Sequence, residues 1–272
     1  MTRLLALIAT ICLAPVMLYA QSASSSLVSL EDRRATEGWE AVGRLDIGFG
    51  GFCTATLIQD RLVLTAAHCV YGDDGELLPT DAFTFKAALR NGRAEATRSI
   101  VRVVPHPAFE PQGEIITNEA IANDIAVLEL AQAIRLTSVQ PFSVAARPRR
   151  GDEVAIVSYG RGRSEAPSLQ ETCTILGRNA GTLVMNCDIA KGSSGAPVFR
   201  VENGRAQIVS VVSASAIESP TPISYGTSLQ GPLRVLLAEF ASRGPAQPGG
   251  TQRLISIGER HDTGAKFIRP NN

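Results

Sequence analysis

The stretch Lys191–Pro197, which reads Lys-Gly-Ser-Ser-Gly-Ala-Pro, carries the first indication of both fold and chemistry in this chain of 272 residues. A serine hydroxyl is a weak nucleophile, so a reactive serine needs an exposed Oγ, amide N–H groups for the developing oxyanion, and a general base. Gly192 lets the backbone aim its N–H at a reacting carbonyl without an intervening Cβ, and Gly195 permits a sharp turn. The stretch therefore predicts Ser194 as a nucleophile, with the N–H groups of Gly192 and Ser194 forming an oxyanion hole.

A turn of this composition is common in β proteins, so its interpretation depends on finding a base elsewhere in the chain. Histidine occurs three times, at positions 68, 106 and 261. His68 follows the apolar strand pattern Leu62–Thr65 and directly precedes a cysteine. Because imidazole titrates near neutral pH, His68 is the predicted general base. His261, in a polar tail, is interpreted as incidental.

The predicted acid is Asp124, which directly precedes the apolar segment Ile125–Leu130. A carboxylate that is charged but shielded at the mouth of a strand can hold an imidazole in one tautomer and stabilise its protonated form. We therefore predict that Asp124 orients His68. The order His68, Asp124, Ser194 is the order found in chymotrypsin and differs from the subtilisin and α/β-hydrolase orders.

These motifs resemble those of the trypsin-like (chymotrypsin-fold) serine proteases. Lys191–Pro197 is similar to the family signature Gly-Asp-Ser-Gly-Gly-Pro, with Ser193 in the Asp place and Ala196 in the second Gly place. Thr65–Cys69 matches the histidine motif Thr-Ala-Ala-His-Cys, and Asn123–Ala126 resembles the aspartate motif. The segment 106–109 resembles the His-Pro-aromatic loop that often precedes the aspartate motif, which implies a structural role for His106. The resemblance implies two antiparallel β-barrels with the active site in the cleft between them, and a C-terminal helix.

The same resemblance extends from about Trp39 to Phe240, which is most of the chain. The sequence Cys-Asp followed by Gly-Ser-Ser-Gly also resembles bacterial trypsin-like members related to glutamyl endopeptidases. In the family, the residue before the nucleophile is an Asp that receives a newly cut N-terminal ammonium. Ser193 is uncharged and cannot form that ion pair. We therefore expect activity that does not depend on a freed N-terminus, although Arg33-Arg34 could be a processing site.

The remaining pattern predicts an all-β protein, because short segments rich in Val, Ile, Thr or aromatic residues alternate with Gly, Pro and polar turns. The eight predicted strands are Phe52–Ile58, Arg61–Thr65, Phe83–Leu89, Ser99–Val104, Ile125–Leu130, Glu153–Tyr159, Val198–Val201 and Ala206–Ser213. Pro232 and the apolar positions that follow it at helical spacing predict a helix that ends at Gly244. The expected divisions are a signal peptide (1–20), an N-terminal segment (21–38), an N-terminal barrel (39–145), a C-terminal barrel with its helix (146–242) and a tail (243–272).

The first twenty residues have the pattern of a secretory signal peptide: Arg3, then the apolar run Leu4–Leu18, then the small residue Ala20. We expect a secreted or periplasmic protein that has no membrane association once this segment is removed. The 26 basic and 26 acidic residues balance, so the sequence does not favour nucleic acid as a partner. A monomer that binds a peptide or protein substrate is expected, and no cysteine and histidine cluster suggests a metal or another cofactor.

Four of the five cysteines lie beyond the predicted leader, which in an exported chain indicates two disulfides with three possible pairings. Cys53 and Cys69 flank one hairpin-like pattern, and Cys173 and Cys187 flank another. The local pairing, Cys53 with Cys69 and Cys173 with Cys187, is therefore favoured. The first bridge resembles the histidine-loop disulfide of the family.

The resemblance also implies a substrate pocket. Asp188 stands where trypsin-like enzymes have the residue at the pocket base, and a buried Asp there would favour Arg or Lys before the cut. In glutamyl-endopeptidase-like relatives the equivalent stretch need not form such a pocket, so a structural Asp188 stays open. The other residues assigned to the pocket are Ser213, Ala214, Ser215 and Gly226.

The function that these observations favour is a secreted serine endopeptidase that works through an acyl-enzyme. Two alternatives remain at the level of sequence. One is a catalytically silent homologue that binds peptides or proteins in the same cleft. The other is an esterase with the same three residues.

Overall fold

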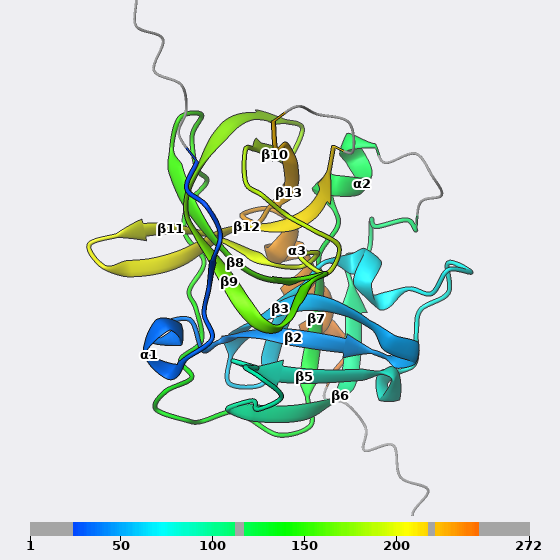
Figure 1. Ribbon diagram of the computed structural model, residues 1–272. Coiled ribbons are helices and arrows are strands. Elements are labelled where there is room, and N and C mark those ends of the chain that lie inside the picture. Colours follow the sequence, from blue (N-terminus) through cyan, green and yellow to red (C-terminus); the bar gives the residue numbers. More distant parts are fainter. Residues whose placement is uncertain (1–23, 112–116, 217–220, 245–272) are drawn as a thin grey trace, which may run out of the picture.

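A computed structural model of the protein describes residues 24–111, 117–216 and 221–244, which form two groups of antiparallel strands and few helices (Figure 1). The all-β fold class with a C-terminal helix is confirmed. The expected signal peptide, nearly all of the expected tail, and His261 lie outside the described residues.

The first group of strands closes into a barrel in the order β2-β3-β4-β7-β6-β5. Phe83 and Phe85 point inward from one strand, because side chains two apart share a face. Gly43 is required where two strands approach, since a Cβ there would lie 2.5 Å from the Phe85 ring and from the Lys86 carbonyl. The strands are β2 (Val42–Ile47), β3 (Gly51–Gln59), β4 (Leu62–Thr65), β5 (Phe83–Ala87), β6 (Ala96–Pro105) and β7 (Ala126–Leu130).

The second group runs in the order β9-β10-β13-β12-β11-β8, and β8 also pairs with β9, so that these strands form a closed ring. A short strand, β1 (Val28–Ser29), pairs with Leu169 and Ser168 of β9. The ring strands are β8 (Glu153–Gly160), β9 (Arg163–Asn179), β10 (Thr182–Met185), β11 (Pro197–Glu202), β12 (Arg205–Ser215) and β13 (Ser224–Ser228). Together with the closed barrel, this ring agrees with the expected two-barrel architecture.

An aromatic cluster connects the two barrels: Trp39 precedes β2, Phe142 lies between β7 and β8, and Phe199 lies in β11. The ring of Phe199 lies 5.0 Å from Trp39 and 4.6 Å from Phe142, centroid to centroid. Phe199 is fully buried, and it belongs to the same apolar core as the first-barrel residues Val42 and Leu64. Continuous burial of this kind fixes the barrels against each other.

The helical segments are short except at the C-terminal end. Helix α3 (Pro232–Ser242) begins at a proline, as predicted, and packs against β6 and β7 of the first barrel. Arg102 of β6 donates to the Phe240 carbonyl at 3.1 Å, and its guanidinium carbon lies 3.5 Å from the centroid of the Phe240 ring. The other helices are α1 (Arg33–Thr36), α2 (Asn118–Ala122), η1 (Gly48–Gly50), η2 (Ala67–Val70) and η3 (Thr80–Ala82).

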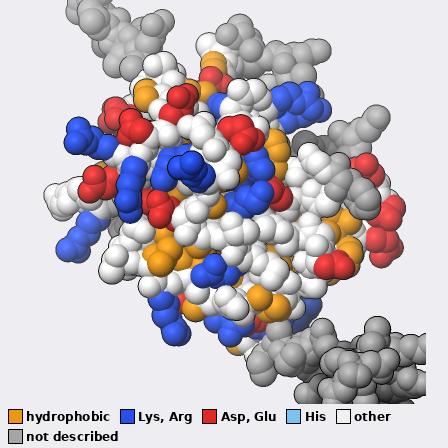
Figure 2. Space-filling view, turned by 60° about the horizontal axis from the view of Figure 1, so that its bottom comes forward, with side chains coloured by type: hydrophobic (Ala, Val, Ile, Leu, Met, Phe, Trp, Pro, Cys, Tyr) orange, Lys and Arg blue, Asp and Glu red, His pale blue; other side chains and the backbone are white. Residues whose placement is uncertain are grey.

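The surface agrees with the balanced charge of the sequence. Acidic and basic side chains are interspersed over much of the face in Figure 2. Among the helices in the described ranges, none has the length and apolar character needed to cross a membrane.

Candidate active site

Two predicted site residues, His68 and Asp124, are brought together by the pairing of β4 with β7. His68 lies in η2, just after β4, and Asp124 lies just before β7, with Thr65 opposite Ala126 in the ladder. Asp124 is only 3% exposed. One oxygen accepts the backbone N–H of His68 at 2.8 Å, and the other lies 2.7 Å from His68 Nδ1.

This contact decides the tautomer of His68. An ionised carboxylate can only accept, so the proton of neutral His68 is on Nδ1 and the lone pair is on Nε2. Desolvation lowers the pKa of His68, but the charge and hydrogen bond of Asp124 outweigh it, and the pKa is raised above its ordinary value. The imidazole can therefore accept a proton at Nε2 and be stabilised when charged.

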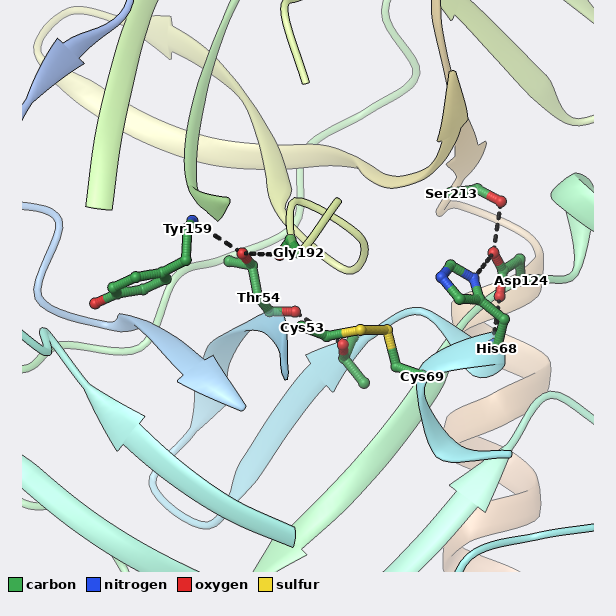
Figure 3. Close-up of a disulfide and its surroundings, with 9 residues drawn as sticks. Cys53, Thr54, His68, Cys69, Asp124, Tyr159, Gly192 and Ser213 are labelled. Carbon is green, nitrogen blue, oxygen red and sulfur yellow. Dashed lines mark hydrogen bonds and ion pairs between the residues drawn. A yellow bond between two sulfur atoms is a disulfide. The ribbon is translucent and has the colours of Figure 1, made fainter. Parts of the chain in front are cut away.

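Ser213 has a role that the sequence did not indicate. It was expected in the wall of the substrate pocket, but its Oγ donates to the Asp124 carboxylate at 2.5 Å (Figure 3). The carboxylate thus accepts three hydrogen bonds from the protein. Ser213 lies on β12 of the second ring, so the acid is held by both barrels.

The predicted nucleophile turn has the backbone that its glycines suggested. Gly192 has φ +97° and Gly195 has φ +79°, both in the left-handed region. A Cβ at Gly195 would lie 2.1 Å from Thr65 Oγ1 and 2.2 Å from the Thr54 carbonyl, so the turn is pressed against the first barrel. Ser194, between these glycines, is partly exposed.

The first barrel also binds this turn directly. The N–H of Thr54, in β3, donates to the Ser194 carbonyl at 2.8 Å. Thr54 follows Cys53, whose disulfide partner Cys69 follows His68. The backbone of Ser194 is therefore linked through Thr54 and the Cys53–Cys69 disulfide to the segment that carries His68. Figure 3 shows this disulfide between Thr54 and His68.

Ser193 points inward rather than toward solvent and is fully buried. Its Oγ accepts from Arg163 Nη2 at 3.0 Å and from the Ala190 N–H at 3.2 Å, and it donates to the Tyr159 carbonyl at 3.1 Å. Burial lowers the pKa of Arg163, and the charge of Asp188 opposes that effect. The position that would hold a carboxylate in the family signature is thus occupied by a hydroxyl bonded to a guanidinium.

The two disulfides are Cys53–Cys69 and Cys173–Cys187, which is the pairing that the sequence favours. Within the described ranges, Cys53, His68 and Cys69 bring potential ligand atoms within 4.8 Å of one another. Two of these atoms are bonded sulfurs, and a metal requires thiolates. This cluster is therefore not a metal site.

The residues assigned to the substrate pocket differ in burial, from exposed to fully enclosed. Asp188 is exposed, and its N–H donates to Gln170 Oε1 at 2.8 Å. The expected preference for Arg or Lys depended on a buried Asp188. An exposed carboxylate is screened by water and salt, so this basis for the preference is absent. Ser215 is also exposed, and Gly226 is pressed between strands, where a Cβ would lie 2.4 Å from Ser210 Oγ. Ala214 is half-buried near the end of β12.

A cavity of about 460 Å³ lies directly beside His68. Its aromatic wall is formed by Tyr71 and Phe109, whose ring centroids are 5.6 Å apart. The other lining residues are Gly72, Asp73, Asp74, Gly75 and Pro111. His106 supports the neighbouring segment: it is buried, which lowers its pKa, and its Nδ1 accepts the Ala108 N–H at 3.3 Å.

Fold and site together define a two-barrel protein with a histidine–carboxylate pair and a serine turn at the junction of the barrels. A family model described as Trypsin matches residues 30–229. The chain belongs to the trypsin family of serine proteases, a family of hydrolases that act on peptides or proteins.

Curated relatives match part of the chain. Serine protease 56 from Homo sapiens is 28% identical over 191 residues, covering 61% of this chain and 30% of that protein. Serine protease SP24D from Anopheles gambiae is 33% identical over 153 residues, covering 52% of this chain and 49% of that protein. Chymotrypsin-like elastase family member 1 from Bos taurus is 32% identical over 130 residues, covering 43% of each.

The chain thus spans about a third to a half of the length of these three relatives. These relatives are animal proteins, and they give no support to the finer resemblance to bacterial glutamyl endopeptidases.

Proposed function

We propose that this chain is a serine endopeptidase in which Ser194 is the nucleophile, His68 the general base and Asp124 the residue that orients it. The observation that carries the proposal is the 2.7 Å contact between His68 Nδ1 and the buried Asp124 carboxylate, at the junction where the Ser194 turn meets the first barrel. Membership of the trypsin family supports a peptide bond as the target.

The reaction follows from the tautomer. His68 Nε2 removes the Ser194 proton as Oγ attacks the carbonyl, and Asp124 stabilises the imidazolium. The imidazolium then protonates the leaving amine, which leaves an acyl-enzyme on Ser194. Water deprotonated by His68 hydrolyses this ester and restores the serine.

The N–H groups of Gly192 and Ser194 are proposed to hold the oxyanion. Among the described residues neither N–H has a protein acceptor, which leaves both free for a substrate oxygen. Loss of one such donor typically lowers kcat by about 10²- to 10³-fold. These donors would act most strongly when a substrate excludes water from the turn.

We also propose that the turn is competent without a freed N-terminus. The buried hydroxyl of Ser193 has its hydrogen bonds from Arg163 and Ala190, both within the chain. An incoming ammonium would meet a guanidinium of like charge rather than a carboxylate.

Export is part of the proposal, because residues 1–20 have the pattern of a signal peptide and two disulfides persist best in an oxidising compartment. N-terminal sequencing of the exported protein should find a mature end near Gln21. A reduced protein that retains Met1 inside the cell would contradict this.

The test of the main proposal is labelling by a fluorophosphonate probe, with hydrolysis of a peptide library measured in parallel. Wild type should label on Ser194, located by peptide mass mapping, and Ser194→Ala and His68→Ala should not label. The adjacent Ser193 is the internal control, since its Oγ is buried and turned inward. A folded, oxidised wild type that neither labels nor cleaves peptides would refute the proposal.

A further inference from the structure

Thr54 lies where the first barrel meets the predicted nucleophile turn, 192–195, and it is fully buried. Resting on the proposed function, we infer that Thr54 is a positioning residue for the oxyanion hole: its hydroxyl fixes the carbonyl of Gly192 and thereby the direction of the Gly192 N–H. Thr54 does not touch the reacting atoms.

The hydroxyl of Thr54 has two partners whose roles leave no ambiguity. The N–H of Tyr159, in β8, can only donate, so Thr54 Oγ1 accepts from it, at 3.0 Å. The carbonyl of Gly192 can only accept, so the single hydroxyl proton is donated to it, at 2.9 Å. One side chain thus connects β3, β8 and the turn (Figure 3).

These contacts remove the freedom that a glycine brings. Gly192 can adopt both hands of backbone conformation at little cost, so its own geometry does not specify where its N–H points. The Gly192 carbonyl is held by Thr54, and the N–H of the same peptide, on Ser193, donates to the Ala190 carbonyl at 2.8 Å. The preceding carbonyl, of Lys191, accepts from the Arg161 N–H at 2.7 Å. With both flanking peptides held, the Gly192 N–H has one direction.

The contribution of the hydroxyl can be separated from that of the backbone. The Thr54 N–H to Ser194 carbonyl bond and the Thr65 Oγ1 to Thr54 carbonyl bond involve only main-chain atoms of Thr54. Substitution of the side chain leaves these atoms in place. Thr54→Val keeps the branched shape and removes the hydroxyl alone.

The chain offers a matched control on the same strand. Thr56 is also fully buried, and its hydroxyl donates to the Ala41 carbonyl at 3.4 Å, away from the turn. Thr56→Val therefore reports the general cost of exchanging a buried hydroxyl for a methyl group in β3. Thr54→Ser restores the hydroxyl at the tested position.

The experiment measures kcat and KM on a peptide substrate, with rates divided by the active-site concentration obtained by exhaustive fluorophosphonate titration. Thr54→Val should lower kcat by about 10- to 100-fold with KM changed by less than about 3-fold, because only the oxyanion contact is misaligned. Affinity for a peptide aldehyde, which forms a tetrahedral oxyanion, should fall in parallel. Thr54→Ser and Thr56→Val should both stay near wild type.

The inference is overturned if Thr54→Val retains wild-type kcat per active site, or if Thr56→Val loses as much as Thr54→Val. If Thr54→Val does not fold, Thr54→Ala, which introduces no extra volume, is judged by the same criteria. An inactive wild type would refute the proposed function and this inference with it, whereas an active wild type with an unaffected Thr54→Val refutes this inference alone.

Discussion

Replacement of Asp124 by asparagine should disable the base while leaving the shape of the site intact. The carboxylate accepts hydrogen bonds from the His68 backbone N–H, His68 Nδ1 and Ser213 Oγ. Asparagine has one accepting oxygen, which can stay on the backbone N–H, and an amide NH₂ that then faces Nδ1. Nδ1 must accept from that amide, so the imidazole proton moves to Nε2. His68 could then no longer remove the Ser194 proton.

The expected loss is about 10⁴-fold in kcat, the cost of the wrong tautomer, which corresponds to about 5 kcal/mol of activation free energy. The pH dependence should change as well. Asp124 raises the pKa of His68, so the acid limb of the wild-type kcat/KM profile should lie above the ordinary histidine value of about 6.5. Without the carboxylate, the limb of the residual activity should move to lower pH.

The free energy of unfolding should fall as pH rises through the pKa of His68 in the folded protein. Because the pKa of His68 is raised in the folded state, its stabilising contribution is complete below the unfolded-state pKa of about 6.5. That contribution is lost as pH rises through the folded-state pKa. Wild type should show this decline in the free energy of unfolding, and Asp124→Asn should not.

The assay is kcat/KM from about pH 5 to about pH 9 for both proteins, with urea unfolding at each pH. Ser213→Ala is the control, because it removes one hydrogen bond and leaves the carboxylate and the tautomer unchanged. A variant Asp124→Asn that kept more than about a tenth of wild-type kcat, or an unmoved acid limb, would refute the reasoning.

Three further predictions concern the framework of the site. Removing the Cys53–Cys69 bridge by a double Ser substitution should lower the free energy of unfolding by about 3 kcal/mol for a loop of this size, measured by urea titration; an unchanged midpoint would contradict this. Gly195 and Gly204 both have positive φ, so an Ala at either position should cost a backbone term of about 1–2 kcal/mol. Gly195→Ala should cost about 1–3 kcal/mol more than Gly204→Ala, because a Cβ at Gly195 would overlap the first barrel whereas Gly204 lies in open space; equal losses would exclude the overlap. A chain that begins after Arg34 should gain no kcat/KM over one that begins near residue 21, and a large gain would show that trimming activates.

Strands with strong local patterns were predictable, and strands defined by their neighbours were not. The run Leu62–Thr65 is apolar and fully buried, and it was identified from sequence. Strand β2 was missed, because Gly43, Arg44 and Asp46 interrupt its apolar pattern. Arg44 and Asp46 form an ion pair on the outer face, which the sequence alone does not reveal.

Strand β9 was missed for a related reason. It contains Pro167 and many polar residues, and its ladder with β8 has register shifts, so no period-2 alternation runs along it. Its length comes from pairing with three other strands rather than from propensity. The hairpin-like pattern between Cys173 and Cys187 indicated β10 and the end of β9, whereas β13 was missed and β1 is too short to leave a signal.

In the candidate site, too, residues in local sequence motifs were predictable and contacts between distant parts of the chain were not. Each of His68, Asp124 and Ser194 sits in a local motif, and local motifs can be read from sequence. The hydroxyl of Thr54 is 138 residues from Gly192 along the chain, and Ser213 is 89 residues from Asp124. Such contacts exist only once both barrels have closed, so no nearby residue signals them.

The two ends of the described chain cross over, each leaving its own barrel to cover the other. Strand β1 precedes the first barrel yet pairs with β9 of the second, and α3 follows the second barrel yet packs on β6 and β7 of the first. A ribosome releases the chain from its N-terminal end, so the first barrel emerges before residues 232–242 exist to cover it. Leu233 and Leu236 can join the buried core that includes the first barrel only after α3 has been synthesised. The final packed state of each barrel therefore requires a segment from the opposite end of the described chain.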